Sequence, residues 1–378
     1  MSFFVTLVIL ISLAYTSLIL IWILGWNRQP IFQVPPQFIP HTKVSVIIPA
    51  RNESTHIAEC IQSIIDNNYP KDLLEIIVID DHSTDDTYAI AQQFSASHPH
   101  VQCIRLADFL PQYKPVNAYK KKAIEAGISV AKGELIITTD ADCKAPVAWI
   151  RTIVARYEAD KPVMIAGPVA FEGGNRFVHL FQTLDFLSMQ GITASVHALK
   201  MGNMCNGANL AFSKEAFYHV GGYSGVDHLA SGDDYLLMMK MRLQYPGKIA
   251  YIKAAEAIIT TPPQPNWRSF MQQRIRWASK TGKYDDKYVT SMLALVYLFN
   301  LSILVLTCIP GYINYALCML GLKMLSEGIF LIPVSSFFHR QRLMWWFPVF
   351  QPFHIVYVLS AGLLGLTGHY QWKERTVK

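Results

Sequence analysis

Two nearly uncharged regions at opposite ends constrain this chain more than any other feature. Residues 3–26 carry no Asp, Glu, Lys or Arg, and residues 288–378 carry only eight such side chains. The other 52 of the 60 charged residues lie between positions 28 and 287. About 20 consecutive apolar residues are enough for a helix to cross the hydrocarbon core of a bilayer. The sequence therefore predicts a polar domain held between membrane segments, which excludes a secreted protein, a disordered chain and a purely soluble enzyme.

The apolar segments divide the chain into three parts. Residues 3–26 lack a basic start and a small-residue cleavage site, so we expect a retained anchor rather than a signal peptide. The uncharged stretch 289–322 is interrupted by Pro310-Gly311, which indicates a helical hairpin. A further span is expected from about residue 346 to 366. We therefore predict an N-terminal transmembrane anchor over 1–27, a polar domain over 28–287, and a C-terminal membrane region of about three segments over 288–378.

The distribution of basic residues bears on location and partners. The tail from residue 288 contributes four of the six net positive charges, which leaves +2 for the polar domain and predicts no nucleic-acid partner. Lys and Arg beside membrane segments mark the cytoplasmic side. We expect a multi-pass membrane protein with its polar domain in the cytoplasm, as in a bacterial inner membrane. Four full crossings would place the basic C-terminus outside, so either this tendency is overridden or the Pro352 segment is re-entrant.

Cysteine spacing argues against two other classes of protein. The six cysteines form no CxxC pair, and no His lies at zinc-site spacing from them. We expect reduced thiols in a cytosol-facing protein, without a disulfide framework or a structural zinc.

The polar domain alternates β-branched runs with helical stretches. Strands are expected at 44–48, 74–79, 101–105 and 134–139, with helices between them. This alternation predicts an α/β fold, Rossmann-like, with a mostly parallel sheet and ligands at the carboxyl ends of the strands. Neither a GxGxxG nor a GxxxxGK[ST] motif is present, which argues against a dinucleotide or P-loop site of the usual kind.

Acidic pairs follow two of these strands. Asp140 and Asp142 come directly after the fourth strand and offer oxygen ligands to a hard divalent cation such as Mg²⁺ or Mn²⁺, although a solvated turn is the alternative. Asp80 and Asp81 end the second strand, where they can hydrogen-bond a nucleobase or ribose, or cap the next helix.

Two further motifs lie later in the polar domain. Asp233 and Asp234 precede an apolar-periodic run and could supply a general base, or simply an acidic first turn for a helix. Residues 273–277 read QRIRW within a helix expected near 266–285. The guanidinium of Arg can donate two hydrogen bonds to a phosphate, and Trp can stack on a ring. The alternative interpretation is a basic helix at the membrane surface.

Taken together in order and spacing, these motifs resemble the family 2 glycosyltransferases, which have the GT-A fold and use nucleotide sugars. The segments that carry the resemblance lie within about residues 43–285 and read SVIIPARNE, EIIVIDDHSTDDT, KKKAIEAGISVAKGELIITTDAD, GDDYLL and QRIRW. The resemblance implies a GT-A catalytic domain with transmembrane helices at both ends.

The resemblance also implies roles for individual residues. Asp142 is the stronger metal ligand and Asp140 its partner, while Asp234 stands in the base position beside Asp233, which replaces the usual Glu. The donor nucleotide is held near the strand ends by Pro49, Glu53, Asp80, Asp81, Lys120 and Asp140. The diphosphate and the acceptor are framed by Asn209, Gln273, Arg276 and Trp277.

These observations predict an inverting, metal-dependent glycosyltransferase that carries a sugar from a UDP- or GDP-sugar to a membrane-associated acceptor, a lipid or a glycan, on the cytoplasmic face. Its arrangement resembles enzymes of the ceramide glucosyltransferase type. A processive polysaccharide synthase is the rival within the class. A membrane scaffold or transporter subunit with an inactive nucleotide-binding fold is the rival from another class. The helical stretch 176–200 is either plain core or part of a surface that receives a lipid acceptor.

Overall fold

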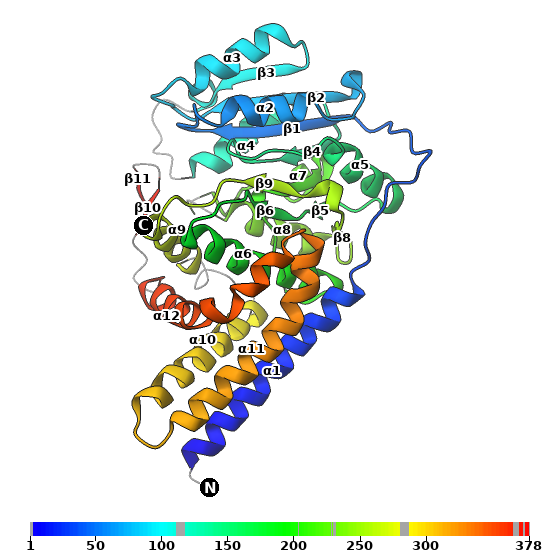
Figure 1. The fold of residues 1–378 in the computed structure, drawn as a ribbon. Coiled ribbons are helices and arrows are strands. Elements are labelled where there is room, and N and C mark those ends of the chain that lie inside the picture. Colours follow the sequence, from blue (N-terminus) through cyan, green and yellow to red (C-terminus); the bar gives the residue numbers. More distant parts are fainter. Residues whose placement is uncertain are drawn as a thin grey trace. The chain divides into compact units, whose positions relative to one another are not determined.

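The structure is a computed structural model of the 378-residue chain (Figure 1). It describes residues 3–110, 118–202, 204–227, 229, 232–279, 287–365, 370–372 and 375–377. The chain forms two compact units, each made of segments that are far apart in sequence. The helical unit comprises Met1–Gln29, Gly173–Asn203 and Pro263–Lys378, and the sheet unit comprises Pro30–Glu172 and Met204–Pro262.

The sheet unit is built on seven strands in the order β3-β2-β1-β4-β7-β5-β8. Strands β1 to β4 are parallel, β7 is antiparallel to both of its neighbours, and β5 and β8 pair in parallel. The strands are β1 (Val44–Ala50), β2 (Leu74–Asp80), β3 (Val101–Arg105), β4 (Leu135–Thr138), β5 (Met164–Ala166), β7 (Leu210–Ser213) and β8 (Ile249–Tyr251). A separate parallel pair joins β6 (Val169–Phe171) to β9 (Ile259–Thr261). The predicted mostly parallel sheet is confirmed.

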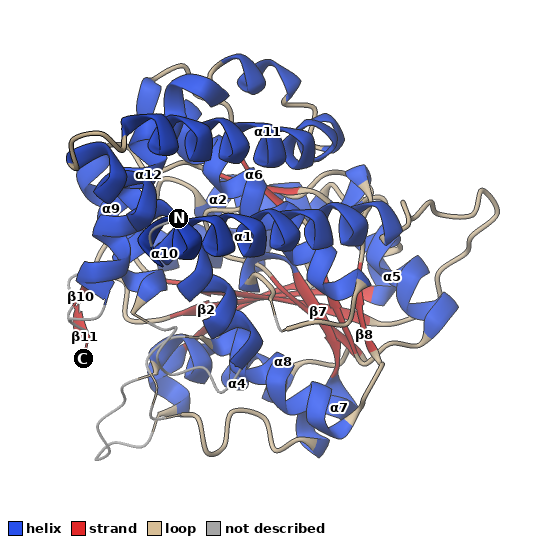
Figure 2. Ribbon diagram, turned by 90° about the horizontal axis from the view of Figure 1, so that it is seen from below, coloured by secondary structure: helices blue, strands red, loops and turns tan. Residues whose placement is uncertain are grey.

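Helices cover both faces of this sheet. In Figures 1 and 2, α2 and α4 lie on opposite sides of it. The apolar runs of β1 and β2 are buried almost completely, as expected of strands covered on both faces. The helices are α2 (Ile57–Ile65), α3 (Thr87–Ser97), α4 (Tyr119–Val130), α5 (Trp149–Asp160), α7 (Lys214–His219) and α8 (Asp233–Gln244).

The helical unit contains most of the apolar length of the chain. Within the described residues, four helices are long and apolar enough to cross a membrane: Val5–Arg28, Tyr288–Cys308, Ile313–Phe337 and Phe347–Gly365. They belong to α1 (Phe3–Arg28), α10 (Lys287–Cys308), α11 (Ile313–Phe337) and α12 (Phe347–Gly365). The unit also holds α6 (Phe177–Ala198), α9 (Trp267–Ala278), β10 (Tyr370–Trp372) and β11 (Arg375–Val377). The expected anchor, hairpin and third span therefore appear as helices close to the expected positions.

The N-terminal helix α1 packs tightly against α6. A Cβ at Gly25 would lie 2.6 Å from the carbonyl oxygen of Ser195, so only glycine permits this approach. The Ser195 hydroxyl donates a hydrogen bond to the carbonyl of Trp22 at 2.8 Å. Small residues allow this close contact between membrane helices. Thus α1 is a packed member of the helical unit, and α6 forms much of the core of that unit.

Candidate active site

The parallel strands bring the predicted donor-binding residues to one edge of the sheet. Asp80 is the last residue of β2, and Asp140 and Asp142 follow the end of β4. Strand β1 pairs with both β2 and β4 and ends at Ala50, between Pro49 and Glu53. Since carboxyl ends of parallel strands meet at the same edge, this edge is where a ligand is expected to bind.

The two acids after β2 differ in what their oxygens contact. Asp80 is 6% exposed, and its Oδ2 accepts a hydrogen bond from the Ser83 amide at 3.4 Å. Its Oδ1 is buried and has no hydrogen-bond partner among the described residues. Asp81, in contrast, pairs with Nδ1 of His82 at 2.9 Å. A buried acceptor without a partner is costly, which makes Asp80 the better candidate to receive a donor N–H from a ligand.

The loop after β1 is tied to the loop after β2. The Arg51 guanidinium donates to the carbonyl of Asp81 at 2.8 Å, and the Glu53 amide donates to the Thr87 hydroxyl at 2.7 Å. Asn52 and His82 both have left-handed backbones, with φ of 50° and 55°. Such conformations in non-glycine residues concentrate at ligand-binding sites, because the surrounding contacts must hold them. These contacts fix the position of the predicted residue Glu53.

Lys120, in the first turn of α4, connects two of the predicted acidic motifs. Its Nζ lies 2.6 Å from Oδ1 of Asp140 and 3.7 Å from Oδ2 of Asp233. Burial opposes the charge on Lys120, but attraction by Asp140 and then Asp233 outweighs it and raises the pKa of the ammonium group. Lys120 therefore stays charged, and the residues after β4 and at the start of α8 form one site.

The start of α8 presents its two acids differently. Gly232 caps the helix with φ of 78°, a conformation that favours glycine. Asp233 is 8% exposed, whereas Asp234 is half-buried. Asp234 accepts hydrogen bonds from the amides of Gly207, at 3.0 Å, and Tyr235, at 2.8 Å. Asp234 is thus fixed in orientation while remaining reachable from outside.

Gly207 lies at the centre of this group. A Cβ built on it would be 3.4 Å from Oδ2 of Asp233, 3.6 Å from Nζ of Lys120 and 3.7 Å from Cβ of Asp234. These are ordinary contact distances, so the backbone tolerates a side chain here. That side chain would, however, occupy the space that the three polar residues surround.

Asp140 and Asp142 have the donor atoms that Mg²⁺ or Mn²⁺ prefers, namely carboxylate oxygens. The side chain of Asp140 is 37% exposed and Asp142 is half-buried. Within the described residues, no group of three or more His, Cys, Asp or Glu side chains is arranged to hold a metal ion. These two carboxylates therefore remain the candidate protein ligands for a divalent cation.

Two thiols flank this pair without adding ligands. Burial, followed by the charges of Asp142 and Asp140, raises the pKa of both Cys60 and Cys143. The raised pKa keeps both thiols protonated at neutral pH.

Two residues beside the site have structural roles that sequence reasoning did not specify. Lys121 is 1% exposed and donates to the carbonyls of Val226, at 2.9 Å, and Leu229, at 2.5 Å, which holds the loop before α8. The sequence of the consecutive lysines 120–122 does not show which of them has this role.

Asn209 is 1% exposed and forms hydrogen bonds with Trp149, Pro168 and Ala257 through its side chain. This arrangement makes Asn209 a positioning residue rather than an exposed acceptor contact.

The QRIRW segment lies on α9 in the helical unit. Arg274 is 2% exposed, forms an ion pair with Asp185 of α6 at 2.8 Å, and lies 4.2 Å from the centre of the Trp277 ring. Gln273 accepts a hydrogen bond from Arg274 at 3.4 Å, and Arg276 and Trp277 are half-buried. Arg274 thus anchors the motif, a role the sequence reading missed. The one available signal was an aspartate in the otherwise uncharged stretch 177–198.

Comparison with known proteins decides the family. The model of "Glycosyl transferase family group 2" matches residues 135–363, which is more than half of the chain, and that of "Glycosyl transferase family 2" matches residues 45–221. The chain belongs to the family 2 glycosyltransferases. Its resemblance to that family is therefore confirmed, and the ceramide glucosyltransferase type stays a prediction.

Individual relatives of this family 2 glycosyltransferase are distant. It is 28% identical over 302 residues to the probable glycosyltransferase YdaM of Bacillus subtilis, covering 77% of this chain and 66% of the relative. It is 26% identical over 128 residues to the beta-monoglucosyldiacylglycerol synthase of Synechocystis, covering 34% of this chain and 26% of the relative. The matched regions thus span less than two thirds of these relatives.

A solved structure supports the fold of the whole chain. The mannosyltransferase PcManGT of Pyrobaculum calidifontis, solved with GDP-Man and Mn²⁺, superposes with a TM-score of 0.53 at 18% identity. The alignment covers 92% of this chain and 99% of that one. Together with the sheet order, this likeness confirms the predicted GT-A fold.

Proposed function

We propose that this glycosyltransferase moves a sugar from a UDP- or GDP-sugar to a hydroxyl group of a membrane-associated lipid, with inversion at the anomeric carbon and with Mg²⁺ or Mn²⁺ as cofactor. The observation that carries the proposal is the position of Lys120 between Asp140 and Asp233. Through these two contacts, Lys120 joins the candidate cation-binding pair, Asp140 and Asp142, to the start of α8, which carries the candidate base Asp234. A related fold solved with GDP-Man and Mn²⁺ supports the choice of donor class and metal.

Donor binding uses the carboxyl edge of the sheet. The Oδ1 of Asp80, which has no hydrogen-bond partner in the described part of the chain, would accept an N–H of the nucleobase. Asp81, Pro49 and Glu53 would shape the surrounding loops. Asp140 and Asp142 would hold the divalent ion, which neutralises the diphosphate as it leaves. Lys120, freed from Asp140 by that ion, would contact a diphosphate oxygen.

The chemical step is a displacement at the anomeric carbon. The acceptor oxygen forms a bond to this carbon from the face opposite the diphosphate, and the bond to the diphosphate oxygen breaks with its electron pair. Asp234 takes the proton of the acceptor hydroxyl, for which its fixed and partly exposed carboxylate is suited. Asp233 stays paired with Lys120 and orients the site.

The apolar helices of the helical unit support a proposal for the membrane setting. We propose that residues 28–287 act in the cytoplasm, where Gln273, Arg276 and Trp277 contribute to diphosphate and acceptor binding. Helix α12, which contains Pro352 and packs against α9 and α10, is proposed to lie at the cytoplasmic interface without a full crossing. In Figure 1 it runs in a different direction from α1 and α11. This topology leaves three crossings and keeps the basic C-terminus in the cytoplasm, as the positive-inside tendency requires.

The direct test compares membrane lipids from cells that produce the wild-type chain, the Asp234→Asn variant or neither. The proposal predicts a lipid with one added sugar in the first sample alone, detected by mass spectrometry. Purified protein should make the same product from a UDP- or GDP-sugar. A ladder of polymer lengths would instead identify a processive polysaccharide synthase. Absence of any donor turnover, with nucleotide bound, would identify a non-catalytic membrane subunit.

A further inference from the structure

The helical unit contains a partly open cavity of about 150 Å³ that the proposed chemistry does not use. Five helices line it: α1, α6, α10, α11 and α12. Most of its wall is apolar and includes Ile19, Trp22, Leu184, Leu293, Phe330 and Leu331. By volume it holds about five water-sized groups, which is comparable to a small lipid headgroup.

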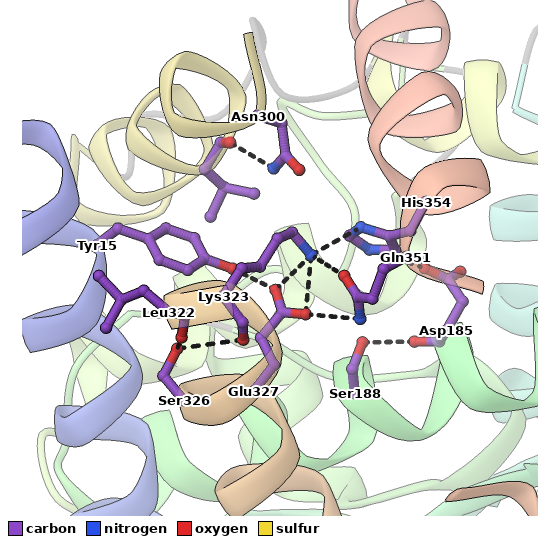
Figure 3. A network of polar contacts seen from close by, with 11 residues as sticks. Tyr15, Asp185, Ser188, Asn300, Leu322, Lys323, Ser326, Glu327, Gln351 and His354 are labelled. Atoms are coloured by element: carbon purple, nitrogen blue, oxygen red, sulfur yellow. Dashed lines mark hydrogen bonds and ion pairs between the residues drawn. The ribbon is translucent and has the colours of Figure 1, made fainter. Parts of the chain in front are cut away.

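Part of the cavity wall is polar, which is unusual among membrane helices. Asp185, Ser188, Glu327, Gln351 and His354 all line it. Figure 3 shows these side chains converging from α6, α11 and α12, with Tyr15 of α1 hydrogen-bonded to Glu327. Ionisable residues at such depth are costly to bury, and they usually mark a binding site or a transport pathway.

The basic side chains that pair with Glu327 and Asp185 do not line the cavity. Lys323 is fully buried and contacts both oxygens of Glu327 at 2.8 Å and the amide oxygen of Gln351 at 2.6 Å. Arg274 pairs with Asp185 at 2.8 Å. The residues that line the cavity include two carboxylates and neither lysine nor arginine. The surface offered to a ligand is therefore rich in hydrogen-bond acceptors and does not attract an anion.

One gap in this wall has the dimensions of a hydroxyl site. Nε2 of His354 lies 3.9 Å from Oδ1 of Asp185, which is too far for a direct hydrogen bond. A hydroxyl oxygen about 2.8 Å from each atom can donate to the carboxylate and accept from the imidazole.

We infer that this cavity binds the neutral, hydroxyl-bearing head of a membrane lipid, a lipid alcohol in preference to a lipid phosphate. The apolar wall contacts the first carbons of the lipid chain, and the Asp185–His354 gap receives the hydroxyl. A phosphate head is disfavoured because its charge would face two carboxylates without a lining cation.

Photolabelling of the full-length protein tests the inference. The protein, in nanodiscs of phosphatidylcholine, is exposed to a diacylglycerol with a diazirine near its head, or to a phosphatidic acid with the same chain. We expect the diacylglycerol probe to label peptides of α6, α11 and α12, and to exceed the phosphatidic acid probe by about tenfold, the effect of one charge-assisted hydrogen bond. Equal labelling by both probes, or labelling confined to other segments, would overturn the inference.

Two variants and a matched control sharpen the test. Ile192→Trp fills the cavity from α6 and His354→Leu removes a polar contact, whereas Leu325→Trp adds the same bulk at a position that is 64% exposed. Each of the first two should lose most of the diacylglycerol labelling, and the control should keep it. Unchanged labelling in either correctly folded cavity variant would contradict the inference.

Nucleotide binding separates the two claims. Binding of UDP- and GDP-sugars is measured on the same nanodisc samples. If the wild-type protein binds neither donor, the proposed function fails whatever the lipid result. If it binds a donor while the cavity stays unlabelled, only the lipid inference fails.

Discussion

The Nζ atom of Lys120 lies 2.6 Å from Oδ1 of Asp140, the first acid of the pair proposed to bind the metal. This lysine compensates the charge of Asp140, which a divalent ion would also compensate. A divalent ion that binds this pair as proposed would have to displace the ammonium group, and a bound diphosphate would give that group a new partner.

Lys120→Met should move two measurements in opposite directions. Mn²⁺ binding without nucleotide should strengthen by about tenfold, because a competing cation is removed. The turnover number should fall by about 10²-fold, because the leaving diphosphate loses one positive contact. Electron paramagnetic resonance titration and steady-state kinetics give the two values. The control is Lys122→Met, whose parent side chain forms a pair with Glu125 at 2.7 Å. If both parameters fell together, the displacement account would be wrong.

Asp234→Asn should lower the turnover number by about 10²–10⁴-fold with little change in donor affinity, because it removes the proton acceptor and keeps the shape. Asp233→Asn should be milder, since the amide oxygen of Asn can still face Lys120. The measurements are the turnover number and the donor Kd of each variant. If the turnover number of Asp234→Asn stayed within a few fold of wild type, or if Asp233→Asn lowered it more, another residue would be the base.

Gly207→Ala tests whether the space between Lys120, Asp233 and Asp234 is used in the reaction. The added methyl group meets these neighbours at 3.4 to 3.7 Å, so the fold should tolerate it. We expect an unchanged melting temperature and a turnover number reduced by about tenfold or more, since misplacement by about 1 Å is costly in catalysis. Gly247→Ala is not a suitable control, because Gly247 has φ of 77°. Ala208→Ser, which adds one atom at the neighbouring position, is the control variant. Wild-type turnover in Gly207→Ala would show that the reaction does not use this space.

The ion pair between Arg274 and Asp185 should stabilise the helical unit. Arg274→Gln leaves a buried carboxylate without its partner, which typically costs about 3–5 kcal/mol. Arg268→Gln on the exposed side of α9 should cost less than about 0.5 kcal/mol. Unfolding of the full chain in mixed micelles compares the two. Equal stabilities would show that the pair does not hold α9 to α6.

The sheet and the positions of the acids were predictable because both depend on local pattern. β-branched runs defined β1 to β4 closely, and parallel pairing then brought Asp80, Asp140 and Asp142 to one edge. The apolar lengths defined the four candidate membrane helices in the same way.

Long-range partners could not be predicted from one sequence. Nothing local distinguishes Lys120 from Lys121, although one faces the acids and the other holds the loop before α8. The pairing of Arg274 with Asp185 joins residues 89 positions apart. The spacing of Lys323 and Glu327 does not predict that Lys323 also contacts Gln351. Only tertiary packing determines such contacts.

The most direct test of the central claim is donor turnover by the purified full-length protein with and without metal. Excess EDTA should abolish turnover of the UDP- or GDP-sugar, and Mn²⁺ or Mg²⁺ should restore it. Asp142→Asn should need about tenfold more Mn²⁺ for half-maximal turnover, because it removes one anionic oxygen ligand. Asp66→Asn, at the end of α2, should behave as wild type. Full turnover in excess EDTA, or a wild-type metal requirement in Asp142→Asn, would contradict the account.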